Sequence, residues 1–464
     1  MKTTIFTLSL ILAGVLAQAN SLLTNPQTGQ PFSPGTSNSI GGIELVSNGA
    51  DVALIIAHHT NRSLYAVDIN DNDPADAPAN AITEIPDFKT EIEAAIGVAN
   101  ITIRNFEVNP ISKSVYVLVN DGSGNRYIVV VKNNGANITS LNLTNVNYVA
   151  IAFPSTGNSY DFVEDMCWGN NTLYISLGGY WLDNFVGTVT APFSHNSSLT
   201  NKATSMFKSN MGGGYWTGAP LEKFDFVTVN NENRLAGVTT CAPGFSLLTD
   251  SISGSGILQV QEHFSLNGSM PLKVIAAEQN DTSYLFHLHM GSNLIRIGEK
   301  YIDGSRIAAN QYNNNRISLR EWDNNGNVVR PANLTDADVI IYNEAFSMIA
   351  YYTNYQLLVL DNNDVLRLFT TGTPSTTNIK SVEKESNITV YPNPTKEWIS
   401  IHYPDHLPAN SKVVIYALDG KEVYNKSLPA KNQQIFVNSL KKGVYLVCIL
   451  NDKQKIFQER IVIH

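Results

Sequence analysis

Two glycine-flanked tyrosine–tryptophan pairs are the parts of this chain best suited to contact a ligand. They lie in Gly178–Trp181 and in Gly212–Trp216. Glycine lets a loop lie close to a ligand, and aromatic faces offer flat platforms with polar edges. Sugar rings bind such platforms, so we expect a glycan site on a loop face. Its residues are Tyr180, Trp181, Tyr215 and Trp216. The alternative is that these aromatic side chains fill gaps between packed sheets.

Oxygen-bearing side chains crowd a second segment, Asp68–Asp76. Calcium takes about six to eight oxygen ligands, and a loop rich in Asp and Asn supplies several of them. The segment lacks the glycine and the distal glutamate of an EF-hand, and solvated turn residues would give the same composition. Calcium is the one cofactor that the sequence indicates, and none is required. The expected ligands are Asp68, Asn70, Asn72 and Asp73.

A third candidate is a pair of histidines, His287 and His289, two residues apart on an expected strand. Residues at this spacing project from the same face, so two imidazoles could bind zinc if His263 or Glu262 supplied a third ligand. No ligand spacing rule supports that site. A solvated polar face explains the alternation more simply.

No catalytic motif is present. The chain lacks a nucleophile elbow, a His-Glu-x-x-His helix, a phosphate loop and a dinucleotide fingerprint. Glu164 and Asp165 resemble a carboxylate pair, and Glu222 or Asp225 offers a further partner. Adjacent residues of a strand face opposite ways, so the pair cannot act together unless the segment is irregular. An enzyme acting on polysaccharide therefore stays an alternative without assigned catalytic residues.

Residues 20–369 predict an all-β domain. Runs rich in β-branched and aromatic residues recur between Gly, Asn and Asp turns. The expected strands are Val52–Ala57, Leu64–Ile69, Ser114–Val119, Tyr127–Lys132, Thr172–Leu177, Phe226–Val229, Leu235–Thr239, Ser283–His289, Asn293–Gly298, Ile317–Trp322, Val339–Tyr342, Met348–Thr353, Gln356–Leu360 and Val365–Phe369. One helix is expected at Asp87–Ala99, with Phe88, Ile92, Ala95 and Ile96 on one face.

Strand groups begin roughly fifty to sixty residues apart, which favours a β-propeller. Seven blades are favoured, because six groups are clear and one near residues 300–330 is weak; six or eight blades also fit. Two ordinary β-sandwich domains are the alternative.

Charge is divided unevenly along the chain. Residues 20–381 carry 32 acidic against 19 basic side chains, and residues 382–464 carry 8 against 11. An acidic main domain repels phosphates, which argues against nucleic acid as a partner and suits cations or neutral glycans. The three cysteines, Cys167, Cys241 and Cys448, have no metal-ligand spacing. A Cys167–Cys241 disulfide is one option, and separately buried thiols are the simpler one.

Three motifs follow one another in the last part of the chain. The first runs from Ile388 through Tyr391-Pro392-Asn393-Pro394, the second is the turn Asp419-Gly420-Lys421, and the third contains Gly443 and Tyr445. The prolines interrupt strand pairing, and Asp-Gly between apolar runs indicates a hairpin. The stretch resembles the type A sorting domain of the Bacteroidetes type IX secretion system. The resemblance implies a small immunoglobulin-like β-sandwich at residues 388–464 and the type IX machinery as a partner. A domain with a purely local role is the alternative.

The other end of the chain agrees with export. Residues 1–19 resemble a secretory signal peptide, with Lys2, an apolar run and the small-residue site Ala17-Gln18-Ala19. No later segment reaches the length of a transmembrane helix. Residues 370–387 are rich in Thr, Ser and Gly and are expected to be a linker. We expect a secreted or surface-displayed propeller that binds a ligand at its loop face, after removal of the signal peptide and sorting domain; a structural or adhesive protein is a further alternative.

Overall fold

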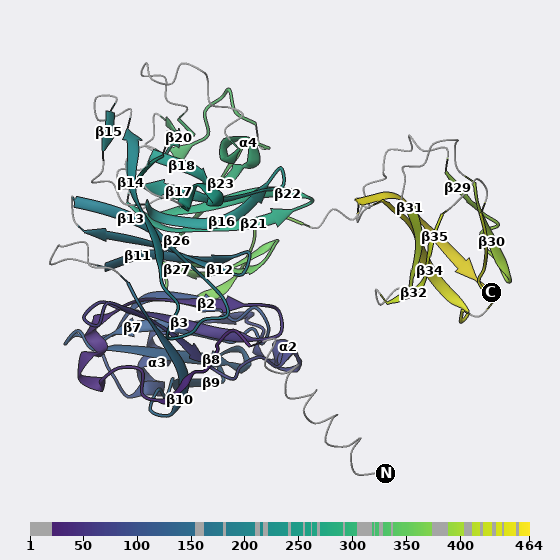
Figure 1. The fold of residues 1–464 in the computed structure, drawn as a ribbon. Coiled ribbons are helices and arrows are strands. Elements are labelled where there is room, and N and C mark those ends of the chain that lie inside the picture. Colours follow the sequence, from purple (N-terminus) through teal and green to yellow (C-terminus); the bar gives the residue numbers. More distant parts are fainter. Residues whose placement is uncertain are drawn as a thin grey trace, which may run out of the picture. The chain divides into compact units, whose positions relative to one another are not determined.

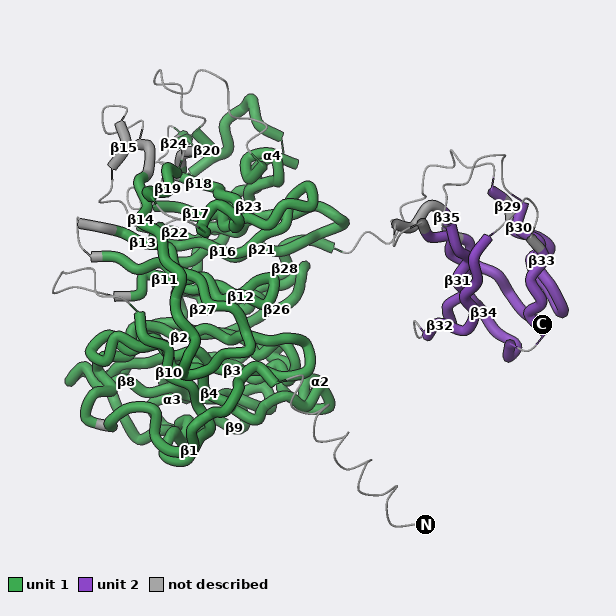
Figure 2. Tube along the Cα trace, viewed as in Figure 1, with its two compact units in different colours: residues 1–374 green, residues 375–464 purple. Residues whose placement is uncertain are grey.

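Antiparallel sheets make up most of the chain in the computed structural model (Figure 1). The chain divides into unit 1, residues 1–374, and unit 2, residues 375–464 (Figure 2). The structure describes residues 21–153, 162–179, 182–208, 214–216, 221–239, 243–253, 256–260, 262–266, 270–290, 293–303, 318–319, 321–323, 328–335, 337–373, 388–402, 411–417, 421–428, 433–438, 440–451 and 454–464.

The described strands of unit 1 form six blades, each named here after its innermost strand. The β2 blade contains β2 (Ile40–Ser47), β3 (Val52–His58), β4 (Ser63–Asp68), β10 (Val146–Ala152) and an edge strand β1 (Gln27–Gly29). The β6 blade contains β6 (Thr102–Val108), β7 (Val115–Asn120), β8 (Arg126–Lys132) and β9 (Asn137–Ser140). The β11 blade contains β11 (Phe162–Gly169), β12 (Thr172–Gly179), β13 (Leu182–Thr190), β14 (Thr200–Lys208), β15 (Gly214–Trp216) and β19 (Ile257–Val260).

The other three blades come from residues 221–370 and one earlier strand. The β16 blade contains β16 (Leu221–Val229), β17 (Glu232–Thr239), β18 (Pro243–Leu248) and β20 (Glu262–Ser265). The β21 blade contains β21 (Pro271–Gln279), β22 (Thr282–His289), β23 (Asn293–Gly298) and the first half of β26 (Val339–Thr353). The β26 blade contains the second half of β26, β27 (Gln356–Asp361), β28 (Leu366–Thr370) and β5 (Glu84–Ile85).

The six innermost strands contact one another in a closed ring. The order of contacts is β2, β11, β16, β21, β26, β6 and back to β2. Two strands complete blades that are distant in sequence, because β10 closes the β2 blade and β5 closes the β26 blade. Unit 1 is therefore a β-propeller whose first and last blades are each closed by a strand from elsewhere in the chain.

The preference for seven blades is not confirmed. The described residues form six, a number that the sequence left open. The weak group near residues 300–330 contributes only the short pair β24 (Glu321–Trp322) and β25 (Val328–Val329) among its described residues. The expected strands Val339–Tyr342 and Met348–Thr353 are the two halves of β26, which serves two blades.

Three equivalent hairpins connect the first and second strands of the β11, β16 and β21 blades. Their turns are Asn170-Asn171, Asn230-Asn231 and Asn280-Asp281, and all six residues have φ between 48° and 62°. Two-residue turns with two left-handed residues match the twist of the flanking strands, and Asn and Asp tolerate that conformation best. The Asn-rich turns thus set the hairpin register of these blades.

In the described part of the chain, the helices are short insertions between the strands. They are η1 (Pro34–Ser39), η2 (Pro74–Asp76), α2 (Ala77–Asn80), α3 (Phe88–Ile96), η3 (Asn133–Gly135), η5 (Thr249–Ile252) and α4 (Glu299–Ile302). The expected helix at Asp87–Ala99 is α3, with Phe88 and Ile92 fully buried. It ends at Gly97, whose φ of 68° suits a glycine after a helix.

Unit 2 consists of two antiparallel sheets over one apolar core. One sheet contains β29 (Thr389–Tyr391), β30 (Trp398–His402) and β33 (Gln433–Phe436); the other contains β31 (Ser411–Ala417), β32 (Glu422–Ser427), β34 (Gly443–Asn451) and β35 (Gln454–Ile463). Ile399, Ile401, Val413 and Ile449 are buried between them. This agrees with the expected small sandwich.

Candidate functional site

Charged side chains converge where the innermost strands of the ring meet. We call them the axial cluster; its members are Glu44 on β2, Glu107 on β6, Asp165 on β11, Asp225 on β16 and Lys273 on β21. Lys273 Nζ lies 2.8 Å from Glu107 Oε1. Strands β21 and β6 are not neighbours in the ring, because β26 lies between them. The ion pair therefore bridges two blades across a third.

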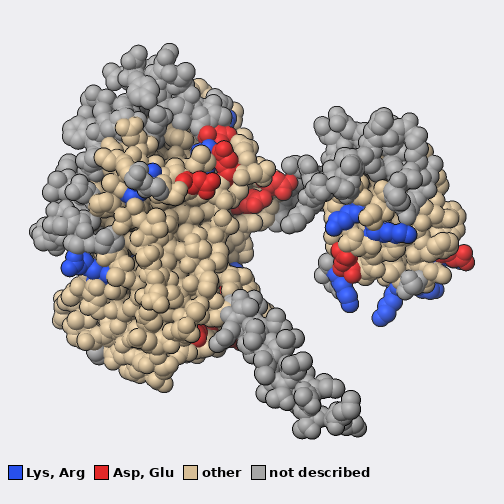
Figure 3. Space-filling model, in the orientation of Figure 1, with Lys and Arg blue, Asp and Glu red and all other residues tan. Residues whose placement is uncertain are grey.

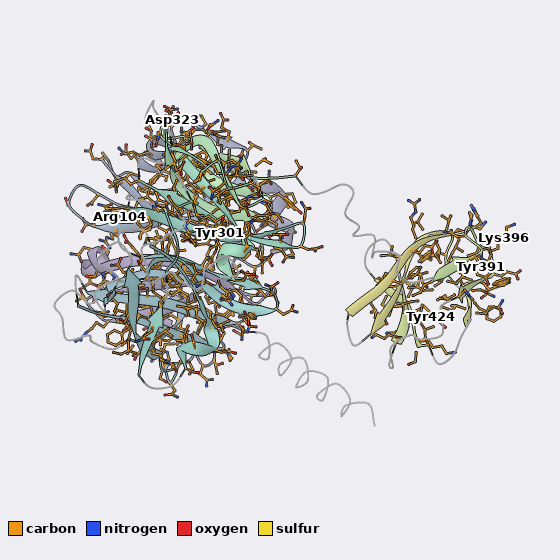
Figure 4. All side chains as sticks on the ribbon, turned by 90° about the horizontal axis from the view of Figure 1, so that it is seen from above. Arg104, Tyr301, Asp323, Tyr391, Lys396 and Tyr424 are labelled. Carbon is orange, nitrogen blue, oxygen red and sulfur yellow. The ribbon has the colours of Figure 1, made fainter. Side chains whose placement is uncertain are left out.

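A β-bulge near the start of each inner strand sets the position of this cluster. The register shifts lie between Ile40 and Gly42, Ile103 and Asn105, Val163 and Asp165, Leu221 and Lys223, Pro271 and Lys273, and Phe346 and Met348. A bulge inserts one unpaired residue and bends the strand. Arg104 is that extra residue in β6 (Figure 4). The repeated bulge re-aims side chains on each inner strand in the same way.

The bulge changes the expectation for Glu164 and Asp165. Regular pairing would place them on opposite faces, but Glu164 is the extra residue of the β11 bulge. Burial raises the pKa of Glu164, Lys223 opposes this increase, and the carboxylates of Glu222 and Asp165 add smaller increases. Asp165 Oδ2 accepts a hydrogen bond from the backbone N–H of Phe224 at 2.9 Å, and Lys223 Nζ donates to the Glu164 carbonyl at 2.6 Å. The structure thus brings β11 and β16 together through these polar groups.

Asp225 is also fixed by the backbone. Its Oδ2 accepts from Ala276 N–H and its Oδ1 from Phe226 N–H, both at 2.7 Å. Burial raises the pKa of Asp225 to about 7, against the effect of these hydrogen bonds and of Lys273. Burial likewise raises the pKa of Glu164 to about 7. Both carboxyls therefore exchange protons near neutral pH.

The remaining cluster members interact strongly. Burial raises the pKa of Glu44 well above its usual range, and Glu107 raises it further. Burial alone would lower the pKa of Lys273, but the surrounding carboxylates, Glu107 first, hold it well above its usual range. The cluster thus combines a permanent cation with carboxyls that retain protons. Within the described residues, no three His, Cys, Asp or Glu side chains are arranged to hold a metal ion.

One of the two tyrosine–tryptophan pairs lies on a described strand of the β11 blade. Tyr180 and Trp181 lie outside the described residues, between Gly179 at the end of β12 and Leu182 at the start of β13. Tyr215 and Trp216 lie on β15, which pairs with the end of β14. The register places these strand ends at the same edge of the sheet as the start of β11. Glu164 and Asp165 are near that start.

The expected calcium loop is held by internal hydrogen bonds. Asp68 Oδ1 accepts from Asn70 N–H at 3.0 Å, and Asp73 Oδ1 accepts from Ala75 N–H at 2.8 Å. Asp71, which is 4% exposed, points inward. Its carboxylate binds Lys132 Nζ and Tyr116 Oη, each at 2.9 Å. Asp71 is therefore a structural residue, and calcium binding by Asp68, Asn70, Asn72 and Asp73 stays a prediction.

The expectation of a solvated histidine face is wrong. His287 and His289 are 0% and 1% exposed. His263, one of the two candidates for a third zinc ligand, is also buried, and its Nδ1 lies 3.2 Å from the carbonyl oxygen of Tyr301. Cys167 is a buried free thiol, and Cys448 is also buried. Cys241 lies outside the described residues, so the expectation that Cys167 and Cys241 are separately buried thiols stays a prediction.

The motif of Tyr391, Pro392, Asn393 and Pro394 ties the two sheets of unit 2 together. The Asn393 amide donates to the carbonyl of Arg460 at 2.6 Å and accepts from Val462 N–H at 3.0 Å. Tyr391 is 51% exposed on the outer face of β29 (Figure 4).

The other two motifs lie at strand ends and turns of the same unit. Gly443 begins β34. The Tyr445 hydroxyl donates to the Lys441 carbonyl at 2.7 Å. Asp419 and Gly420 lie outside the described residues. The Lys421 carbonyl accepts from Ala417 N–H at 2.9 Å.

Surface charge follows the division seen in the sequence. In the face shown in Figure 3, acidic side chains gather on unit 1 near β22 and α4, and Lys and Arg predominate on unit 2. An acidic surface disfavours anionic ligands for unit 1. Among the described residues, no helix has the length and apolar character needed to cross a membrane.

Several solved structures resemble the chain. Plexin A4 full extracellular region, domains 1 to 8, matches at 6% identity over 95% of this chain and 62% of that one, with a TM-score of 0.33. Semaphorin 1a of Drosophila, extracellular domains 1–2, matches at 8% identity over 79% and 94%, with a TM-score of 0.31. An extracellular domain from B. thetaiotaomicron matches at 10% identity over 92% and 69%, with a TM-score of 0.26. The propeller assignment rests on the strand order above.

No curated protein matches the sequence. A family match covers the end of the chain, residues 389–464. It spans the sandwich of unit 2 and includes all three motifs described above. Residues 389–464 therefore belong to the family of secretion system C-terminal sorting domains, of the type IX kind, and the protein is exported to the cell surface or beyond.

Proposed function

We propose that this exported propeller is a binding protein for an uncharged, hydroxyl-rich ligand such as a glycan. The site is the edge of the ring where β11 and β16 begin. The observation that carries the proposal is the contact of β11 with β16 at that edge, on the blade whose β15 carries Tyr215 and Trp216. There Lys223 Nζ donates to the Glu164 carbonyl, and Phe224 N–H donates to the Asp165 carboxylate.

The chemistry of these groups suits hydroxyls. A carboxyl with a pKa near 7, as for Glu164 and Asp225, both donates and accepts hydrogen bonds at neutral pH. Ser176, opposite Asp165 in the sheet, is fully buried, and its hydroxyl has no hydrogen-bond partner among the described residues. A ligand hydroxyl or an ordered water would satisfy it. Tryptophan faces would stack on sugar rings, as the sequence predicts.

The test is retention of the purified chain on a glycan array. The unmodified protein should bind at least one neutral glycan, and Trp181→Ala and Trp216→Ala should each abolish binding while preserving the folded state. Tyr391→Ala, which removes an exposed aromatic side chain from the sorting domain, is the matched control and should bind like the unmodified protein.

Two results would reject this proposal. One is absence of binding by the unmodified chain across neutral glycans. The other is a loss of about 3 to 5 kcal/mol of stability in the tryptophan variants with glycan binding intact, because such a cost indicates aromatic side chains packed in a core.

A polysaccharide-cleaving enzyme is the second candidate. It is favoured by one observation, that burial raises the pKa of Asp225 and of Glu164 to about 7, where a carboxyl can act as a general acid. New reducing ends released from a bound glycan, and lost in Asp225→Asn or Glu164→Gln, would support it. Glycan binding without release of new reducing ends would show that the protein binds the glycan and does not cleave it.

A further inference from the structure

Two histidines of β22 are buried on the face that meets the β16 blade. His287 and His289 lie two residues apart on one face of the strand. Phe286 and Leu288 lie on the opposite face, and both are 0% exposed. Both faces of β22 are therefore inside the protein, and the histidines occupy positions that apolar residues usually take.

The surroundings of His287 are apolar. Its ring meets that of Phe264 edge to face, with centroids 5.6 Å apart. The core between the two blades contains Val238, Phe264, Val274, Leu285 and Ile295. Neither ring nitrogen of His287 has a hydrogen-bond partner among the described residues. Burial lowers the pKa of His287 well below its usual range, so the imidazole is neutral.

A neutral imidazole without partners is costly in a core. Buried polar atoms nearly always have partners, and an unsatisfied one costs about 1 to 3 kcal/mol. A leucine at this position would avoid that cost. A histidine at position 287 therefore indicates a partner, outside the described residues, that contacts one of its ring nitrogens.

We propose that His287 and His289 together bind one divalent transition-metal ion, with zinc as the best chemical fit. The two rings lie nearly parallel, at 26°, with centroids 6.2 Å apart. With zinc–nitrogen bonds of about 2.0–2.1 Å, each centroid would stand about 3.2 Å from the ion, and a tetrahedral angle would place the centroids about 5 Å apart. Binding one ion therefore requires the two rings to turn toward each other and approach by about 1 Å. Neutral imidazole is a favoured ligand of zinc, copper and nickel.

The pair is close to the surface at one end. Strand β22 ends at His289, and the next residue, Met290, is 57% exposed. Met290 N–H donates to the carbonyl of Met270, which is 61% exposed. An ion therefore has a short path to the pair, and water molecules can fill its remaining coordination positions. His263 lies on β20 of the neighbouring blade, where its Nδ1 contacts the Tyr301 carbonyl, and is not one of the two proposed ligands.

Zinc titration of the purified full chain by calorimetry tests the proposal, after treatment with a chelator. We expect one ion per chain, and cobalt in its place should give visible absorption bands. His287→Phe and His289→Phe should each weaken zinc affinity at least tenfold. His263→Phe removes a buried histidine from the neighbouring blade and should keep the affinity of the unmodified protein.

X-ray absorption at the zinc edge needs no variant and counts imidazole ligands directly. Two imidazoles in the unmodified protein support the site, and none or one overturns it. Unchanged zinc affinity in His287→Phe, or no zinc bound by the unmodified chain, would also overturn it. Without metal, His287→Phe should melt at the same temperature or higher, because it removes unpartnered polar atoms; a large fall would assign His287 a structural hydrogen bond instead.

Discussion

Lys273 on β21 forms an ion pair with Glu107 on β6, with Nζ and Oε1 2.8 Å apart, although another blade separates the two strands in the ring. Their side chains are only 16% and 11% exposed. The same ammonium also acts on Glu44 and Asp225. One cation thus holds carboxylates from several blades around the axis of the propeller.

Removing that cation should destabilise the propeller. We expect Lys273→Met to cost about 3 to 5 kcal/mol, because breaking a buried ion pair leaves an uncompensated charge. Denaturant unfolding of unit 1 measures it. The double variant Lys273→Met with Glu107→Gln should recover part of the loss. Equal stability of Lys273→Met and the unmodified protein would show that the pair contributes nothing.

The pH dependence of stability should reveal Asp225. Its pKa is about 7 when folded and near the ordinary value of 3.8 when unfolded. Between these values the folded state holds a proton that the unfolded state has released, so stability falls as pH rises from about 4 to about 7. Asp225→Asn should lack this contribution. Measuring the free energy of unfolding of both proteins across that pH range isolates the contribution of Asp225. If the two free energies change with pH in the same way, the pKa of Asp225 is not raised.

Export should depend on Asn393. Its side chain bridges to Arg460 and Val462, so Asn393→Ala removes two hydrogen bonds, each worth about 0.5 to 1.5 kcal/mol. We expect a reporter fused to residues 382–464, behind a signal peptide, to reach the surface of a bacterium with a type IX system, and the variant to do so less. Asn425→Ala, at an exposed position on β32, is the control. If both variants reach the surface equally well, the side chain of Asn393 is not needed for sorting.

Calcium should raise the melting temperature if the Asp68–Asp76 loop binds it, since an ion that binds only the folded state stabilises it by mass action. We expect the increase between micromolar and millimolar calcium, and its loss in Asp73→Ala. Asp121→Ala changes another aspartate in a turn and serves as the comparison. A melting temperature that does not respond to calcium would leave the loop as a set of turns.

The sequence by itself determined the export domain and the class of fold. Local patterns carry both: the motif around Asn393 is contiguous, and alternating apolar runs separated by Asn turns such as Asn230-Asn231 define hairpins. The helix α3 was also predictable, because its apolar residues repeat at helical spacing. Each of these features depends on residues close together in the chain.

Only the tertiary structure decided the closure of the ring and the site. Strands β5 and β10 pair with blades distant in sequence, which local periodicity does not encode. Glu107 and Lys273 meet only because the ring closes, and the extra residue Glu164 bends β11 in a way that strict alternation excludes. Alternation also failed at His287, since a polar residue every second position looks the same whether that face meets water or another blade.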